Sequence, residues 1–271
     1  MHYDPIKKIF GDVARASTVF RRTFYVLLDL MFLRAWYVKR ALRQLLDPKR
    51  NGSFSIFDAG SGFGQYSYFL ARRYGHAAAI HAVDVKEEQI SDCRDFFARS
   101  GLTNITFAVE DLTQPLHASE FDVILSVDVM EHIVEDVQVF KNFARALKPG
   151  GLVLINTPSD QGGSDAHDDH EESFIGEHAR NGYGAGEITE KLAQAGLRVR
   201  TLSYTYGPVG MAAWRLGIKY PMQMLNWSKA FFLVLPLYYL LTLPLTLILM
   251  YVDYSGSNQT GAGLLVVAEK Q

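Results

Sequence analysis

The first 48 residues show the hydrophobic spacing of a helix. Apolar side chains recur every three or four positions, at Phe20, Phe24, Leu27, Leu28, Met31, Phe32 and Trp36. This spacing gathers them on one helical face, and Asp47-Pro48 ends the pattern because a residue before proline disfavours the helical conformation. Residues 1–48 are therefore expected to form a basic N-terminal helical cap that packs on the core, covers a ligand or touches an anionic membrane face.

From residue 49 onward, short apolar runs alternate with helical segments. The runs predict strands at 54–57, 78–83, 105–109, 121–127, 152–155, 197–204 and 263–268. Helices are expected between them at 65–73, 87–99, 134–147 and 187–195. Alternation of this kind is typical of a parallel sheet with helices on its faces. We expect one α/β domain made of residues 49–206 plus 261–271.

Two segments interrupt the alternation. Residues 160–185 form a polar, acidic loop after the fifth strand, where open α/β sheets carry their ligand crevice. We expect this loop either to touch a substrate or to be only a mobile surface loop. Residues 230–252 contain no charged side chain and are long enough to cross a membrane. Pro236 and Pro244 interrupt helical hydrogen bonding there, and the chain must still return to the same sheet. We expect 207–260 to be a hydrophobic helical insertion, acting as a buried lid or as a hairpin that dips into one leaflet.

Composition narrows the class of protein. The 271 residues can bury a full core, and a formal net charge of −2 gives no electrostatic basis for binding nucleic acid. A single cysteine, Cys93, excludes an internal disulfide and a Cys-x-x-Cys metal site. The first eight residues lack the apolar core of a secretory signal. These observations indicate a cytoplasmic protein, and the apolar insertion places it at the inner face of a membrane.

A glycine-rich turn follows the first predicted strand. Its glycines are Gly60, Gly62 and Gly64, preceded by Asp58. Glycines at alternate positions allow a sharp turn and close backbone approach to a ligand, while the helix that follows favours a polar or anionic group. Gln65 stands where the dinucleotide fingerprint requires its last glycine. A tight turn that binds no ligand would carry the same glycines. Residues elsewhere in the chain are therefore needed to distinguish a ligand-binding turn from a purely structural one.

The pattern Asp-x-Gly-x-Gly-x-Gly resembles motif I of the class I S-adenosylmethionine (SAM) methyltransferases, and further features resemble the same family at later strand ends. They cover about residues 50–205 and the last strand, and they include Leu147-Lys148-Pro149-Gly150-Gly151 before the fifth strand. The resemblance implies a Rossmann-like, seven-stranded, doubly wound α/β sheet with N-terminal helices and the insertion before the last strand. The cofactor-binding residues it implies are Asp58, Gly60, Ser61, Gly62, Gly64, Asp84, Val85, Asp111, Leu112 and Ser126.

Each implied contact has a chemical reason. Asp84 ends the second strand, where its carboxylate would accept both ribose hydroxyls of SAM. Asp111 follows the third strand and would accept from the adenine amino group, with Leu112 against the ring. The glycine turn would hold the methionine part. No metal is expected as a resident group.

Asp128-x-x-Glu131-His132 follows the fourth strand and is similar to the Glu-x-x-Glu-His motif of the ubiquinone-pathway O-methyltransferases. In that group the motif is associated with a divalent cation and membrane lipid, but the shorter aspartate here argues against a metal. The resemblance implies that His132, Asp128 and Glu131 act on the methyl acceptor, with His132 as a base or as a cap of the next helix.

The segment from Glu177 to Leu197 also resembles this methyltransferase group, through its His-x-Arg-x-x-Tyr stretch. The resemblance implies an ordered role for His178, Arg180 and Tyr183. With His167 from the acidic loop, His178 and Tyr183 are the expected substrate-binding residues.

We therefore expect a SAM-dependent methyltransferase acting on a small lipophilic acceptor, such as a quinone, isoprenoid phenol, sterol or lipid, at an oxygen or nitrogen atom. The hydrophobic insertion predicts peripheral or monotopic membrane contact. One alternative is an enzyme of the same fold that binds SAM and transfers a group other than methyl. Another is a membrane-associated scaffold without activity, which the retained acids Asp58, Asp84 and Asp111 disfavour.

Overall fold

A computed structural model describes residues 17–49, 51–116, 118–162 and 179–271. Its centre is a seven-stranded sheet with the order β3-β2-β1-β4-β5-β7-β6, in which β7 alone runs antiparallel to its neighbours. The strands are β1 (Phe54–Ala59), β2 (Ala78–Asp84), β3 (Ile105–Val109), β4 (Phe121–Val127), β5 (Leu147–Pro158), β6 (Leu197–Thr205) and β7 (Gly263–Lys270). The predicted seven-stranded α/β fold is confirmed.

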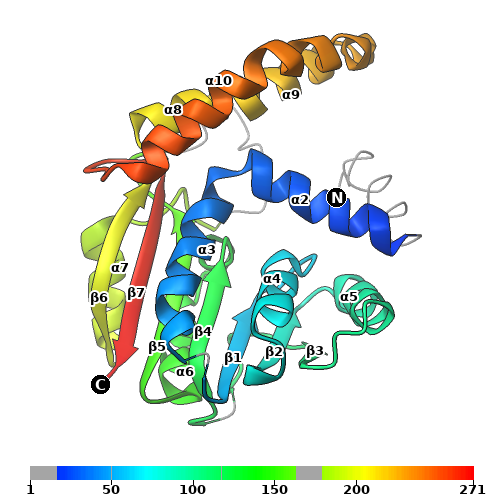
Figure 1. The fold of residues 1–271 in the computed structure, drawn as a ribbon. Coiled ribbons are helices and arrows are strands. Elements are labelled where there is room, and N and C mark those ends of the chain that lie inside the picture. Colours follow the sequence, from blue (N-terminus) through cyan, green and yellow to red (C-terminus); the bar gives the residue numbers. More distant parts are fainter. Residues whose placement is uncertain (1–16, 50, 117, 163–178) are drawn as a thin grey trace.

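Helices cover both faces of the sheet (Figure 1). One layer holds α3 (Leu33–Leu46), α4 (Gln65–Tyr74) and α5 (Glu87–Arg99), and the other holds α6 (Asp136–Ala146) and α7 (Ala185–Gln194). The period-two geometry of β1 explains the two cores. Phe54 and Ile56 point into the first cluster, whereas Phe57 and Ala59 point into the second.

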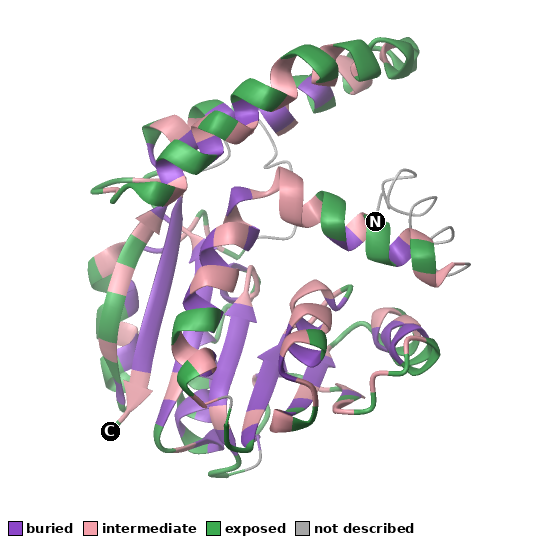
Figure 2. Ribbon diagram, viewed as in Figure 1, coloured by how far each residue is buried: buried purple, intermediate pink, exposed green. Residues whose placement is uncertain are grey.

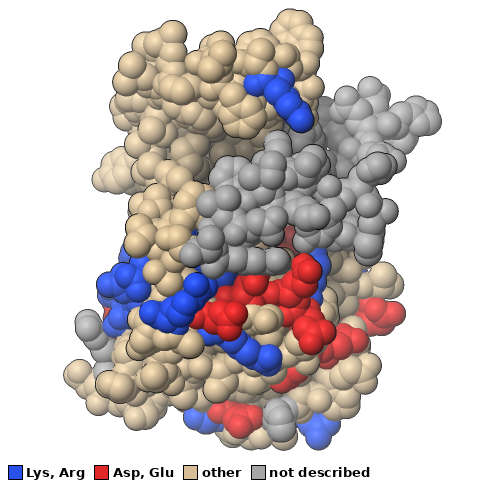
Figure 3. All heavy atoms as spheres, turned by 90° about the vertical axis from the view of Figure 1, so that its right-hand side faces the viewer, with Lys and Arg blue, Asp and Glu red and all other residues tan. Residues whose placement is uncertain are grey.

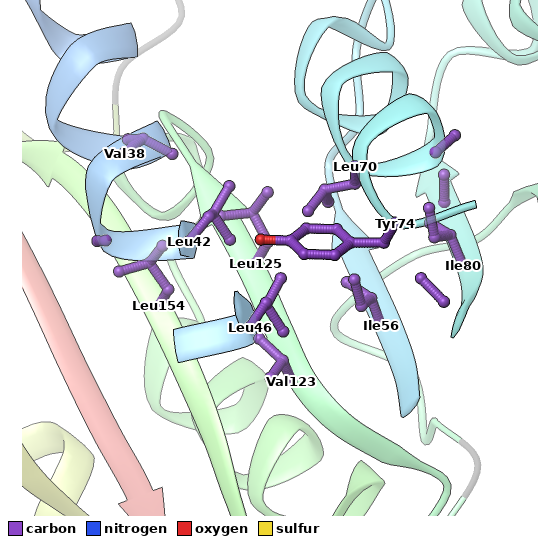
Figure 4. Close-up of a cluster of buried hydrophobic side chains, with 14 of the residues drawn as sticks. Val38, Leu42, Leu46, Ile56, Leu70, Tyr74, Ile80, Val123, Leu125 and Leu154 are labelled. Carbon is purple, nitrogen blue, oxygen red and sulfur yellow. The ribbon is translucent and has the colours of Figure 1, made fainter. Parts of the chain in front are cut away.

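The N-terminal helical cap divides into α2 (Thr18–Met31) and α3, which meet at the extended residue Phe32. Of the three roles expected for this cap, α3 has the first, because it packs on the sheet as part of the core. Its apolar side chains repeat every four residues and so share one face. Figure 4 shows this face meeting the sheet and α4, through Val38, Leu42, Leu46, Leu70, Tyr74, Leu125 and Leu154.

The apolar insertion before β7 is a helical arm that projects away from the sheet (Figure 1). It consists of α8 (Pro208–Trp214), the π-helical turn η4 (Arg215–Lys219), α9 (Tyr220–Trp227), the 3₁₀ turn η5 (Lys229–Leu233) and α10 (Leu235–Ser255). The expected helix pair is present, and Figure 2 shows that its outer side is exposed. We call residues 208–255 the arm.

The helix expected at 134–147 is shorter than its pattern suggested. A 3₁₀ turn, η3 (Met130–His132), precedes it, and α6 begins only at Asp136. Conversely, β5 extends to Pro158 because its whole second half pairs with β7. That long-range pairing orders residues that carry no strand signal of their own.

Candidate active site

The glycine turn lies at the carboxyl end of β1 and leads into α4. Gly60, Gly62 and Gly64 all have positive φ, at 81°, 51° and 75°, a region that side chains other than glycine rarely adopt. A Cβ added at Gly60 would lie 2.3 Å from Cγ2 of Val129. The glycine therefore lets the turn approach the segment that follows β4, so two predicted site segments are neighbours.

Asp84 joins the end of β2 to this turn. One carboxylate oxygen accepts from the Gly62 amide at 2.9 Å, and the other accepts from the Lys86 amide at 3.0 Å. Each oxygen of a carboxylate has a second lone pair, and the side chain is only partly buried. Asp84 is thus held by backbone amides and still able to accept hydrogen bonds from a diol.

Two serine hydroxyls at this site are buried without a hydrogen-bond partner among the residues that the structure describes. They belong to Ser61 in the glycine turn and to Ser126 in β4. Ser126 pairs in register with Ala59, so both hydroxyls belong to the carboxyl end of the central strands. An unsatisfied buried polar group costs roughly 1–3 kcal/mol. Strand-end hydroxyls that lack a partner within the described part of the chain fit a polar ligand such as SAM.

Asp58, expected among the cofactor-binding residues, lies beneath the turn. Its side chain is buried, and one oxygen accepts from the Ser67 hydroxyl of α4 at 2.5 Å. Burial, reinforced by the nearby Asp84 charge and opposed by the Ser67 hydrogen bond, raises the pKa of Asp58 to about 6. In the structure this carboxyl joins β1 to α4 beneath the turn.

The segment after β3 carries an exposed acid next to a buried leucine. Asp111 accepts from the amide and hydroxyl of Thr113 at 2.9 and 2.8 Å. Leu112 lies in the second core cluster, and its carbonyl accepts from Asn142 at 2.8 Å. Val85, after β2, is exposed. Acidic side chains gather on this face of the molecule, as Figure 3 shows.

The three predicted catalytic residues point into different surroundings. Asp128 has a positive φ of 53° and forms an ion pair with Arg34 of α3. Glu131 is buried and accepts from the Thr157 hydroxyl at 3.1 Å, and burial raises its pKa. His132 is exposed. Among the described residues, no group of three or more His, Cys, Asp or Glu side chains is arranged to hold a metal ion.

Arg34 is a site residue that the sequence analysis did not identify. Besides its ion pair with Asp128, its backbone amide donates to the Tyr206 hydroxyl at 3.0 Å. Tyr66, in the first turn of α4, lies beside it: burial raises the pKa of that phenol, and the guanidinium charge acts in the opposite direction. In the sequence Arg34 is one of several arginines on an amphipathic helix, and nothing local relates it to a residue after β4.

The loop after β5 is described only at its end. His167 and His178 lie outside the described residues. Tyr183, expected to contact the substrate, is instead fully buried, and its hydroxyl lies 2.7 Å from an Asp136 oxygen. Asp136 also accepts from Arg180 and from Lys191, the latter at 2.8 Å. Arg180 and Tyr183 are both held by side-chain contacts, as an ordered role requires. The contacts of Tyr183 fix this loop to α6 and α7.

Comparison with known proteins relates the sequence to enzymes with named reactions. The profile of a family described as "Methyltransferase domain" matches residues 51–197. Ubiquinone biosynthesis O-methyltransferase of Coxiella burnetii is 30% identical over 103 residues, which are 38% of this chain and 42% of that protein. Probable chloroplastic tocopherol O-methyltransferase of Oryza sativa subsp. japonica is 31% identical over 105 residues, which are 38% of this chain and 28% of that protein. The matched segments thus span less than half of these curated relatives.

Among solved structures, phosphoethanolamine N-methyltransferase 2 of Haemonchus contortus in complex with SAM resembles this chain in fold. The TM-score is 0.58 at 17% identity, and the match covers 91% of this chain and 60% of that chain. A match at this identity shows a likeness in fold.

Proposed function

Because this chain belongs to the SAM-dependent methyltransferases, with the family's domain over residues 51–197, we propose that it transfers the methyl group of SAM to a lipophilic small-molecule acceptor. The acceptor atom is an oxygen or a nitrogen. The observation that carries the reaction is the arrangement at the strand ends: a glycine turn held by Asp84, with the open hydroxyls of Ser61 and Ser126.

The residues around the turn suit the parts of SAM. Asp84 has the two acceptor oxygens that a ribose diol requires, and Ser61 and Ser126 offer hydroxyls to further polar groups. Arg34 provides a cation for the carboxylate of the methionine part, at the cost of its ion pair with Asp128. Asp111 remains the proposed acceptor for the adenine amino group.

Bound SAM supplies a methyl group on a positively charged sulfur, ready for displacement by a lone pair. The work of this chain is to align the acceptor with that methyl group and to exclude water. Alignment of this kind can provide about 7–11 kcal/mol of the barrier. His132, exposed after β4, is the proposed base that takes the proton lost by the acceptor, and Asp128, paired with Arg34, is a second acid–base candidate.

Two observations favour a lipophilic acceptor. The arm displays a long apolar surface next to the domain that carries the site. The relatives are named for ubiquinone biosynthesis and for tocopherol, and both of these molecules are lipophilic. We place the enzyme at the cytoplasmic face of a membrane, where such molecules partition.

Two experiments test the proposal. Calorimetry with SAM and S-adenosylhomocysteine should give binding heats for both, and the absence of heat with either would refute the cofactor site. Incubation of a lipid extract with methyl-labelled SAM should label a lipophilic product identifiable by mass. Binding of SAM with no labelled product from lipid extracts, but with labelling of water-soluble compounds, would contradict the lipophilic acceptor.

A further inference from the structure

The arm exposes apolar side chains in a pattern that the fold does not use. On α10, Leu237, Leu240, Leu241, Leu245, Ile248 and Val252 are all exposed. Their spacing places them on one stripe along the helix, and the opposite side of α10 packs toward the body through Thr246 and Met250. By length and composition, α10 is also the one described helix that is apolar enough to cross a membrane.

The free end of the arm continues this surface. Trp227, just before the short turn η5, is 84% exposed, and Leu233, the last residue of that turn, is 87% exposed. Figure 2 shows the exposed side following the arm from its base to its end. Monomeric soluble proteins rarely display a contiguous apolar surface of this kind.

Several polar groups of the arm are satisfied from within. Pro221 has no amide hydrogen, so it cannot serve the carbonyl of Gly217 one helical turn earlier. The Tyr239 hydroxyl donates to that carbonyl at 2.9 Å, and the Tyr238 hydroxyl donates to Leu216 at 2.6 Å. Thr242 likewise donates to the carbonyl of Tyr238 at 2.9 Å. Internal satisfaction of the backbone is what a hydrocarbon environment requires.

Charge along the arm is of one sign. From 208 to 252 the sequence contains Arg215, Lys219 and Lys229 but no Asp or Glu. Figure 3 shows the arm as an almost uncharged surface with one basic patch. The acid that follows, Asp253, is buried at the base, where it accepts from the Gly210 amide at 2.9 Å and from the Tyr37 hydroxyl at 2.7 Å. This contact fixes both helices of the arm to the body.

We propose that the arm enters the hydrocarbon of a lipid bilayer from one side and anchors the protein there as a monotopic membrane enzyme. The chain enters the arm after β6 and leaves it into β7, and these strands are neighbours, so both ends stay on the same side. The hydroxyls of Tyr238, Tyr239 and Thr242 bond within the arm, and the exposed stripe of α10 from Leu237 to Val252 is apolar, which suits hydrocarbon better than the polar rim of a protein interface. Arg215 and Lys219, in the turn between α8 and α9, complement anionic headgroups.

The test is flotation of the full-length protein with vesicles of phosphatidylcholine and phosphatidylglycerol. The wild type should float with the vesicles. The double variant Leu240→Glu/Leu241→Glu, at positions 73% and 71% exposed, should reduce vesicle binding by about 100-fold. Val134→Glu makes the same kind of change at a 71% exposed site on the body and should bind as the wild type does. Equal binding by wild type and double variant would overturn the proposal.

A second measurement locates the free end of the arm. The chain has three tryptophans, Trp36, Trp214 and Trp227. Brominated lipids should quench the fluorescence of the wild type, Trp227→Phe should remove most of the quenching, and Trp36→Phe should retain it. A stable dimer that shields the arm in solution, with no quenching by lipid, would also overturn the proposal.

The anchor and the proposed reaction can fail separately. SAM binding by calorimetry should be the same for the wild type and the Leu240→Glu/Leu241→Glu variant, because the cofactor residues lie at the strand ends. A variant that binds SAM but not vesicles supports both ideas. A protein that binds vesicles but no SAM would refute the cofactor site and leave the anchor intact.

Discussion

Arg21 of α2 donates through its guanidinium to the carbonyl of Phe63, at 2.8 Å, inside the glycine turn. Tyr25, one helical turn later, donates to the same carbonyl. The same guanidinium reaches the carbonyl of Asp92 in α5 at 2.9 Å. The N-terminal helix therefore holds the turn and α5 together, although it belongs to neither.

Replacing Arg21 should loosen the turn. Arg21→Met removes its buried hydrogen bonds, and each bond to a charged group contributes about 1.5–3 kcal/mol. We expect SAM affinity to fall about tenfold by calorimetry, with a lower free energy of unfolding. Arg22→Met, at the exposed neighbouring position, should change neither quantity. Unchanged SAM affinity in Arg21→Met would show that the turn keeps its shape without α2.

Asp84→Asn tests the ribose contact. The amide keeps the size of the carboxylate but loses its charge and one acceptor oxygen, so SAM should bind about 10–100-fold more weakly. Asp95→Asn, on the exposed side of α5, removes the same charge and should leave the affinity unchanged. If both variants bind SAM equally well, the ribose lies elsewhere.

Asp58 should make stability depend on pH. Its pKa is about 6 in the folded protein, compared with an ordinary value of 3.8. The folded state therefore binds the proton more tightly than the unfolded state does. The protonated form contributes about 3 kcal/mol to the free energy of unfolding, and this contribution is lost as pH rises from about 4 to 6. Asp58→Asn removes this proton. Denaturant titrations should show that the unfolding free energy of the variant, relative to that of the wild type, increases as pH rises over this range. A constant difference would contradict the burial argument.

Asp136 should have the opposite pH dependence. Burial alone would raise its pKa, but hydrogen bonds from Lys191 and Tyr183 and the Arg180 charge lower it below the ordinary value. Its contribution is present above the unfolded pKa of about 3.9 and is lost as pH falls through the lower folded value.

Asp136→Asn removes the buried negative charge that Arg180 and Lys191 share, so we expect a loss of about 3–5 kcal/mol in unfolding free energy at neutral pH. Glu187→Gln breaks a contact of Lys191 with a half-exposed carboxylate and should cost less than about 1 kcal/mol. Similar losses of unfolding free energy in the two variants would show that Asp136 stabilises the loop no more than an exposed ion pair does.

Much of the fold could be predicted because its signals are local. The apolar runs that become β1 to β7 and the glycines of the turn carry their meaning within a few residues. The prolines of the insertion and the return to β7 together predicted a helix pair, which is present. The end of β5 could not be predicted from local signals, since Pro158 joins this strand only through pairing with β7.

The side-chain contacts between distant segments could not be predicted in this way. Arg34 and Asp128 are far apart in sequence and meet only because α3 packs on the sheet beside β4. Tyr183 occupies a stretch that resembles a substrate-binding motif, but its hydroxyl faces Asp136. Asp58 has the spacing of a cofactor residue and bonds to Ser67 beneath the turn. A motif fixes the position of a residue on the backbone, whereas its neighbours are decided by how the layers pack.

The position of β7 imposes an order on folding. This strand lies between β5 and β6, yet it follows the arm in the chain. A ribosome therefore delivers the arm before the sheet can close, and until then β5 and β6 each have an open edge. Pairings between residues so far apart in sequence form slowly. If the arm enters a bilayer as proposed, it would hold the two open edges near the membrane surface until β7 pairs between them, and the sheet would be completed there.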